Sequence, residues 1–99
     1  MSIKVVQIRL LHNDGPVKAF ADIEIEPLGL IIRDFAVLRH QDSHKTYIQG
    51  PRSKWTGPDG KIKQKSILFM PRSLKQAVEL AILAEFTEAE RRRRNETNP

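Results

Sequence analysis

The stretch Val17-Lys-Ala-Phe-Ala-Asp-Ile-Glu-Ile-Glu26 alternates between two sets of side chains along its whole length. One set is apolar and the other is mostly charged: Val17, Ala19, Ala21, Ile23 and Ile25 against Lys18, Asp22, Glu24 and Glu26. A period of two is typical of a β-strand that buries one face and exposes the other to water. The stretch therefore predicts a half-buried antiparallel strand, and solubility explains the acids on its outer face.

The neighbouring segments extend this strand into a sheet. The turn signal Asn13-Asp14-Gly15-Pro16 precedes it, so the strand before that turn should form a hairpin with it. Further strands are predicted, in chain order, at residues 5–11, 30–38, 47–48 and 61–70. The third strand contains Asp34, which is either a buried, paired acid or an acid that points outward.

A long helix is predicted after Pro71. Ser73 and Gln76 have the spacing of a capping box. Apolar residues then recur at helical spacing as far as Ala89. The apolar stripe is widened by Leu80, Leu83 and Ala84. Because a surface helix needs an apolar face of only about 100°, we expect the sheet to cover one side of this helix and a second subunit to cover the other.

The whole pattern predicts a single α+β domain. We expect an antiparallel β-sheet of about five strands followed by one long C-terminal helix, assembled as a dimer. The domain should span residues 1–94, and residues 95–99 should form a frayed tail. The chain has no cysteine, which excludes disulfides and thiolate zinc sites. It also lacks a signal-peptide pattern and a long apolar run, so we expect a cytoplasmic protein with no membrane partner.

Basic residues are concentrated in one part of the chain, residues 45–75, which we call the basic segment. It holds eight Lys or Arg residues and one acid, Asp59, whereas the whole chain has a formal net charge of +5. Its cations are Lys45, Arg52, Lys54, Lys61, Lys63, Lys65, Arg72 and Lys75. Such an excess neutralises phosphates and predicts nucleic acid as a partner.

The stretch Pro51-Arg-Ser-Lys-Trp-Thr-Gly-Pro-Asp-Gly60, inside the basic segment, is expected to be a loop. It contains the only tryptophan, Trp55. We expect the ring to be buried in the core or in an interface; the alternative is an exposed ring on which a base stacks. The predicted nucleic-acid-binding residues are Arg52, Lys54, Trp55, Thr56, Lys61, Lys63, Arg72 and Lys75.

Other candidate sites are weaker. The run Arg91-Arg-Arg-Arg94 either caps the C-terminal end of the helix or binds phosphate, and Glu88 and Glu90 have the spacing to pair with it. His40 and His44 flank a turn without the helix that a zinc pair at this spacing requires. No nucleotide-binding or nucleophile motif is present. We therefore expect no metal, no cofactor, no small-molecule substrate, no catalytic residue and no enzymatic activity.

Several motifs in order resemble one family. They are the opening strand Val5-Val-Gln-Ile-Arg-Leu10, the hairpin strand Lys18-Ala-Phe-Ala-Asp-Ile23, the strand Leu30-Ile-Ile-Arg-Asp-Phe-Ala-Val37, the stretch 51–60 and the terminal helix. Together they resemble the stage V sporulation protein G family, also called the septation proteins, over about residues 3–86. The chain departs from the family's loop in three places: Arg52 and Gly57 look like insertions, and Trp55 stands where a basic or polar residue is more common.

This resemblance implies a compact α+β dimer with no enzymatic role. It also implies binding of DNA, and in some members RNA, in septum formation and developmental regulation. Lys54 and Thr56 lie in the matching loop, and Arg72 and Lys75 lie at the matching start of the helix. We thus expect a homodimeric regulator that binds nucleic acid. The alternative is a protein-interaction module of the cell-division machinery that binds no nucleic acid.

Overall fold

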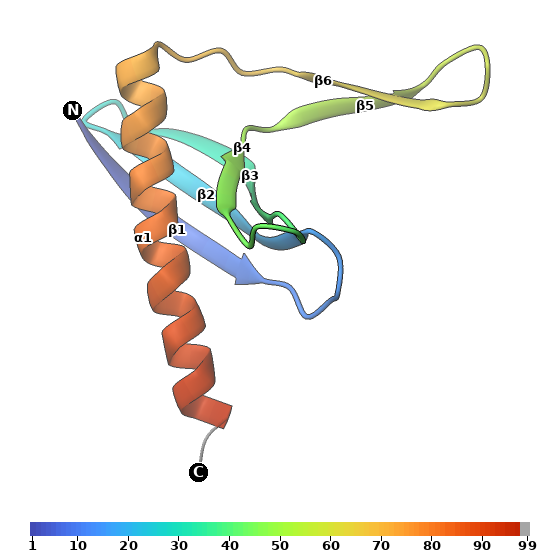
Figure 1. Cartoon of the computed structure of the whole chain (residues 1–99). Helices are drawn as coiled ribbons and strands as arrows, with labels where there is room; N and C mark the ends of the chain where they lie inside the picture. Colours follow the sequence, from blue (N-terminus) through green and yellow to red (C-terminus); the bar gives the residue numbers. More distant parts are fainter. Residues whose placement is uncertain (98–99) are drawn as a thin grey trace.

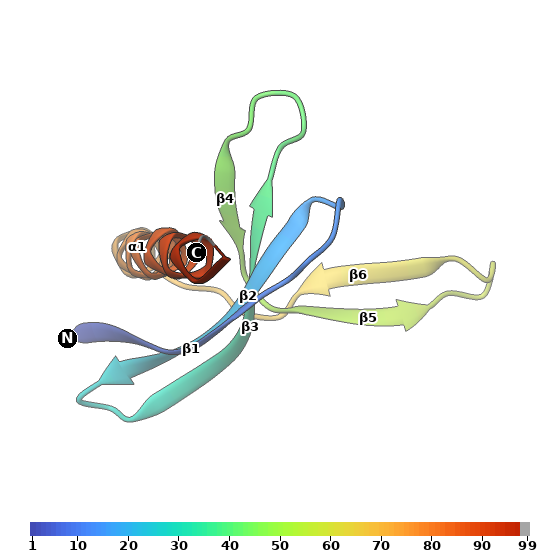
Figure 2. The ribbon, with the colours of Figure 1, turned by 90° about the horizontal axis from the view of Figure 1, so that it is seen from below.

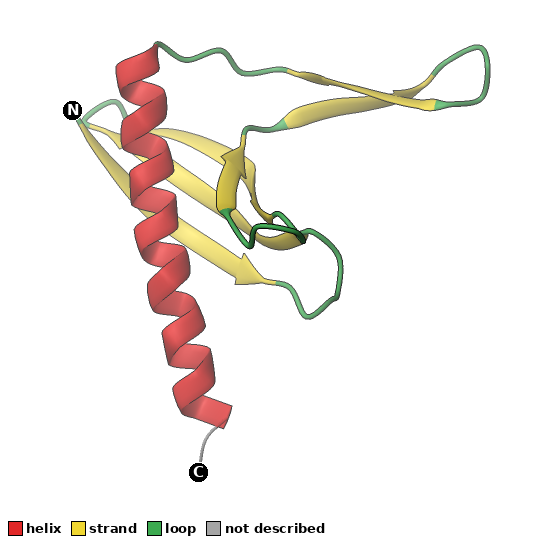
Figure 3. Cartoon of the chain, viewed as in Figure 1, coloured by secondary structure: helices red, strands yellow, loops and turns green. Residues whose placement is uncertain are grey.

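The computed structural model describes residues 1–97, which form six strands and one helix (Figures 1 and 3). The elements are β1 (Ser2–Leu10), β2 (Val17–Glu26), β3 (Leu30–Arg39), β4 (Thr46–Gln49), β5 (Arg52–Thr56), β6 (Ile62–Ser66) and α1 (Arg72–Thr97). The α+β class is confirmed. The strands, however, form two separate sheets, so the prediction of one sheet with about five strands is wrong in its connectivity.

The larger sheet is an antiparallel meander in the order β1-β2-β3-β4. The apolar set of β2 turns inward as predicted, and Ala19, Ala21 and Ile23 are fully buried. Beside them lie Phe35 and Val37 of β3. Alternation along β2 therefore determines which face of this sheet carries the core.

Helix α1 covers that face (Figure 1). Val78, Ile82 and Phe86, spaced four residues apart, are buried against the sheet. Nearer the C-terminal end of α1, Arg39 at the end of β3 links the sheet to the helix, because its guanidinium binds the Glu90 carboxylate at 3.2 Å. The remaining apolar side of α1 is open in the single chain, and Leu80 is 69% exposed. A second subunit over this side stays a prediction.

The ends of α1 differ from the predicted ones. The helix starts at Arg72, where the backbone N–H of Lys75 donates to Pro71 O at 2.9 Å. The Ser73 side chain makes no hydrogen bond among the described residues, so the capping box is absent. At the other end, residues 95–97 of the expected frayed tail are helical, and residues 98–99 lie outside the described part of the chain. Over residues 1–97, no helix is both long and apolar enough to cross a membrane.

Strands β5 and β6 form a hairpin that projects from the body on the side away from α1 (Figures 1 and 2). The Cα radius of gyration is 15.1 Å, whereas a compact domain of this length would have about 13 Å. Every residue of β6 is exposed, so this lysine-rich strand has no apolar face to add to the sheet. Two corrections follow: the last strand ends at Ser66 rather than at residue 70, and the expected loop over residues 51–60 contains β5.

Candidate nucleic-acid interface

The projecting hairpin sorts its side chains onto two faces. Ser53 pairs with Lys65 and Trp55 pairs with Lys63, and directly opposed residues of an antiparallel pair share one face. We call the face made of Ser53, Trp55, Lys63 and Lys65 the tryptophan face. The opposite face, which we call the arginine face, carries Arg52, Lys54, Thr56, Ile62, Gln64 and Ser66.

The arginine face is turned toward the body of the protein. A hollow of about 380 Å³ is lined by Arg52, Lys54 and Gln64 of the hairpin and, on the sheet side, by Phe20 and Asp34 among others. The base of the hairpin is also bonded to the end of β4. With the Gln49 side-chain amide oriented so that its oxygen faces Arg52, the Arg52 guanidinium donates two hydrogen bonds to that oxygen, at 2.8 and 2.9 Å. The tryptophan face consequently points away from the body, into solvent.

The cations of the basic segment lack partner carboxylates. All eight are exposed, and over residues 1–97 none of them forms an ion pair. The single acid, Asp59, is engaged in the turn, where its Oδ1 accepts the backbone N–H of Lys61 at 3.1 Å. The hairpin is therefore an arm whose positive charge is not compensated within the chain.

In the turn between β5 and β6, where Gly60 is left-handed with φ of 77°, Gly57 is buried. Its N–H donates to Lys61 O at 2.9 Å, which continues the strand pairing by one more residue. A Cβ at this position would lie 2.9 Å from Cε of Lys63, and contacts that short require a neighbour to move. Gly57 thus leaves room for the Lys63 side chain beside the turn.

Trp55 is 43% exposed in the chain. The prediction was that the ring is buried in the core or in an interface. Burial in the core of its own chain is therefore wrong, whereas burial in an interface between chains stays a prediction. The ammonium of Lys65 lies 6.0 Å from the ring centroid, within the range of a cation–π contact. Lys65 was absent from the predicted binding residues, although its alternation with Lys61 and Lys63 in the sequence would have placed it on the hairpin.

The structure brings together six of the eight predicted residues, Arg52, Lys54, Trp55, Thr56, Lys61 and Lys63, on the hairpin. Lys75 joins them at the base, because it lines a second hollow, of about 430 Å³, together with Arg52. Arg72 is also exposed, at the first residue of α1, three residues before Lys75. The predicted nucleic-acid-binding residues therefore lie on the hairpin and at the start of α1.

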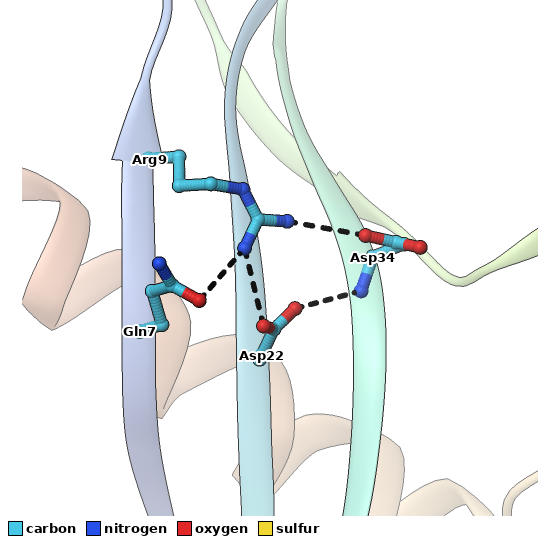
Figure 4. Close-up of polar contacts among 4 residues, drawn as sticks. All are labelled: Gln7, Arg9, Asp22 and Asp34. Atoms are coloured by element: carbon cyan, nitrogen blue, oxygen red, sulfur yellow. Dashed lines mark hydrogen bonds and ion pairs between the residues drawn. The ribbon is translucent and has the colours of Figure 1, made fainter.

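A second polar cluster lies on the outer face of the main sheet (Figure 4). Arg9 reaches from β1 across β2 and binds Asp22 Oδ2 and Asp34 Oδ1, each at 3.1 Å. The other oxygen of Asp22 accepts the backbone N–H of Asp34 at 3.0 Å. Asp22 is only 5% exposed, which corrects the prediction that this acid merely serves solubility, whereas Asp34 is exposed and paired.

The Asp22 carboxylate is held in its charged form. Burial alone would raise its pKa, but the hydrogen bond from Asp34 N–H and the Arg9 guanidinium outweigh burial, so the pKa of Asp22 lies below its usual value. Both carboxylate oxygens are already bonded within the sheet. The cluster therefore stabilises the strands and offers no free acid or base for chemistry.

Carboxylates accompany two of the C-terminal arginines. Arg91 pairs with Glu88, as the spacing predicts. Arg92 pairs with Glu85 at 3.1 Å, and Glu90 turns to Arg39 in the sheet instead of the arginine run. These contacts favour a helix-stabilising role for this part of the run over phosphate binding.

Two histidines contact other side chains. His12 Nδ1 lies 3.5 Å from a guanidinium nitrogen of Arg93. His40 stacks on Tyr47 with a centroid distance of 4.6 Å. In the described part of the chain, no group of three or more His, Cys, Asp or Glu side chains is arranged to hold a metal ion.

Comparisons of the chain with protein-family models, with curated proteins and with solved structures found no match. The hairpin, its charge and the sequence resemblance are accordingly the observations that bear on function.

Proposed function

We propose that this protein is a non-enzymatic, cytoplasmic regulator that binds nucleic acid as a homodimer through the β5–β6 hairpin. The observation that carries the proposal is the hairpin itself: a projecting two-stranded arm with exposed, unpaired cations on both faces. Lys and Arg side chains of this kind release counterions when they neutralise phosphates. Two-stranded ribbons are also an established means of entering a nucleic-acid groove.

Two features support a dimer. Phe69, in the segment between β6 and α1, is 96% exposed, and Leu80 on α1 is 69% exposed. Exposed apolar side chains of this size gain free energy when a partner covers them. A dimer would present two hairpins, so that the spacing between them would set the register on a duplex or along a strand. The septation-protein resemblance supports a role in septum formation or developmental regulation.

Binding by the hairpin predicts a steep dependence of affinity on salt. With about five phosphates engaged, affinity should fall about 100-fold for a labelled single strand and about 500-fold for a labelled duplex between about 50 and 200 mM salt. The double variant Lys54→Glu/Lys61→Glu should weaken binding and lower the logarithmic salt slope by about two. Fluorescence anisotropy at several salt concentrations measures both quantities.

The matched control is Lys4→Glu/Lys18→Glu, which makes the same change in net charge on β1 and β2, outside the hairpin. We expect it to reduce affinity much less than the hairpin variant does. Equal losses in the two variants would show that overall charge, not the hairpin, governs binding. An affinity that does not respond to salt would contradict the proposal outright.

The second candidate is a protein-interaction module of the division machinery. The exposure of Phe69 and Leu80 favours it, since an apolar surface can serve a different protein as well as a second copy. Under this alternative, neither DNA nor RNA binds at any salt concentration, and partners are retained after nuclease treatment.

A further inference from the structure

We propose that the hairpin binds single-stranded nucleic acid, with one unpaired base stacked on Trp55 and the adjacent phosphates held by Lys63 and Lys65. This inference rests on the nucleic-acid binding proposed above and specifies its ligand. It is carried by the position of one aromatic ring among cations on the outward face of the arm.

The ring of Trp55 is open to a ligand where the Lys65 ammonium does not lie over it. It is 43% exposed, and it lies on the tryptophan face, away from the hollow between the hairpin and the sheet. In the part of the chain that the structure describes, β5 and β6 pair only with each other. An apolar surface of this size left in water is a ready platform for another flat ring.

The charges around the ring suit a nucleotide. Lys63 lies directly across from Trp55, and Lys65 holds its ammonium 6.0 Å from the ring centroid. Neither lysine has a carboxylate partner among residues 1–97. A base on the ring would therefore place its flanking phosphates beside cations that are otherwise balanced only by solvent ions.

The preference for a single strand follows from what an aromatic ring can reach. In a duplex each base is stacked on its neighbours, and only base edges and phosphates are accessible from the grooves. The flat face of a base is exposed in single strands, loops and bulges, where aromatic side chains stack on it. Because Trp55 lies on the flat of the ribbon and not at its tip, Gly57 to Lys61, it is poorly placed to act as a wedge between base pairs.

Trp55 is the only tryptophan of the chain, so its intrinsic fluorescence reports directly on the proposed contact. The full-length protein is titrated with oligo(dT), with oligo(U) and with a mixed-sequence duplex, each of about 12 nucleotides or base pairs. We expect the single strands to quench the fluorescence and to bind more tightly than the duplex at the same salt concentration. The dT and U arms show whether DNA or RNA is preferred.

Variants are followed by anisotropy of labelled oligonucleotides. Trp55→Ala should weaken single-strand binding about 5- to 150-fold. It should leave duplex binding and the salt slope nearly unchanged. Trp55→Phe should recover part of the lost single-strand affinity. Val6→Ala is the control, since Val6 is a similarly exposed apolar residue, at 41%, on β1 outside the hairpin. Circular dichroism and the unfolding midpoint verify that each variant is folded.

The outcomes separate this inference from the proposed function. Salt-dependent binding without quenching of Trp55 overturns the stacked single strand and leaves the nucleic-acid proposal standing. Salt-dependent binding that is tighter for the duplex and unaffected by Trp55→Ala has the same meaning. Equal losses on single strands and duplex in Trp55→Ala also overturn it, because they indicate a structural role for the ring. Absence of binding to all three probes overturns both proposals.

Discussion

Asp22 lies where the strand pairing on both sides of β2 is irregular. The register shifts between Val5 and Gln7 on β1, and between Ala21 and Ile23 on β2 opposite β3. On the β3 side there is one extra residue, and Asp34 adopts a left-handed conformation there with φ of 68°, a region that non-glycine residues rarely adopt. The buried carboxylate of Asp22 binds both the Asp34 N–H and Arg9, so it holds the bulge and the neighbouring strand together.

At this scale we predict that Asp22→Asn lowers the free energy of unfolding by about 1–3 kcal/mol at neutral pH, because Arg9 loses its buried charged partner. The pKa of Asp22 is lowered in the fold, so its stabilisation is complete above its unfolded pKa of about 3.9 and is lost as the pH falls through the folded pKa. The gap between the wild type and Asp22→Asn should therefore narrow below about pH 4. Urea unfolding over a pH series measures it.

Glu24→Gln is the matched control on the same face of β2, since Glu24 has no ion-pair partner in the described chain. Its effect should stay within about 0.5 kcal/mol at every pH. A gap for Asp22→Asn that is equally large at neutral and acid pH would show that the charge of Asp22 is not what stabilises the sheet.

At the scale of elements, the hairpin and the body are built on different principles. The body buries apolar residues between α1 and the inner face of the sheet, whereas the hairpin has strand pairing and almost no burial, apart from Gly57. Its two ends meet closely, because Ile67 N–H donates to Pro51 O at 3.3 Å. The arm is therefore a separable addition to the domain.

We predict that replacing residues 52–66 by two glycines leaves the body folded. The free energy of unfolding should change by no more than about 1 kcal/mol, since closing a shorter loop costs little and no core residue is removed. Nucleic-acid binding should be lost. Thermal unfolding and anisotropy test the two parts, and a variant that fails to fold would mean that the hairpin contributes to the core.

At the scale of the whole molecule, the open side of α1 and the segment after β6 form the surface that most needs a partner. The hollow of about 430 Å³ beside them is lined by Tyr47, Phe69, Met70 and Val78, among others. The sheet also ends at β4 with an unpaired edge, and such edges readily pair with another chain. These features together are what a second copy would cover.

We predict a dimer in solution, with twice the 11.4 kDa mass of one chain. Phe69→Glu and Leu80→Glu should each shift the protein to the monomer, because a buried carboxylate without a partner is strongly unfavourable. Ile62→Glu is the control, since Ile62 is 77% exposed but lies on the hairpin. Light scattering after size exclusion measures the mass; a monomeric wild type would contradict the dimer.

The sequence by itself determined the α+β class, the inner face of β2 and the helix that follows Pro71, because these depend on local periodicity that survives in any context. It also located the basic segment. It failed on Asp22, whose place in the alternation is that of an exposed acid, since bulges on neighbouring strands are not visible in a period of two.

Only the tertiary structure decided that β5 and β6 leave the main sheet and project into solvent. The reason is a balance over the whole molecule: a strand with lysine on one side and, apart from Ile62, polar side chains on the other adds little apolar burial by joining a sheet whose inner face is already covered by α1. The same balance leaves Trp55 exposed among cations, because the arm that carries it has no second layer.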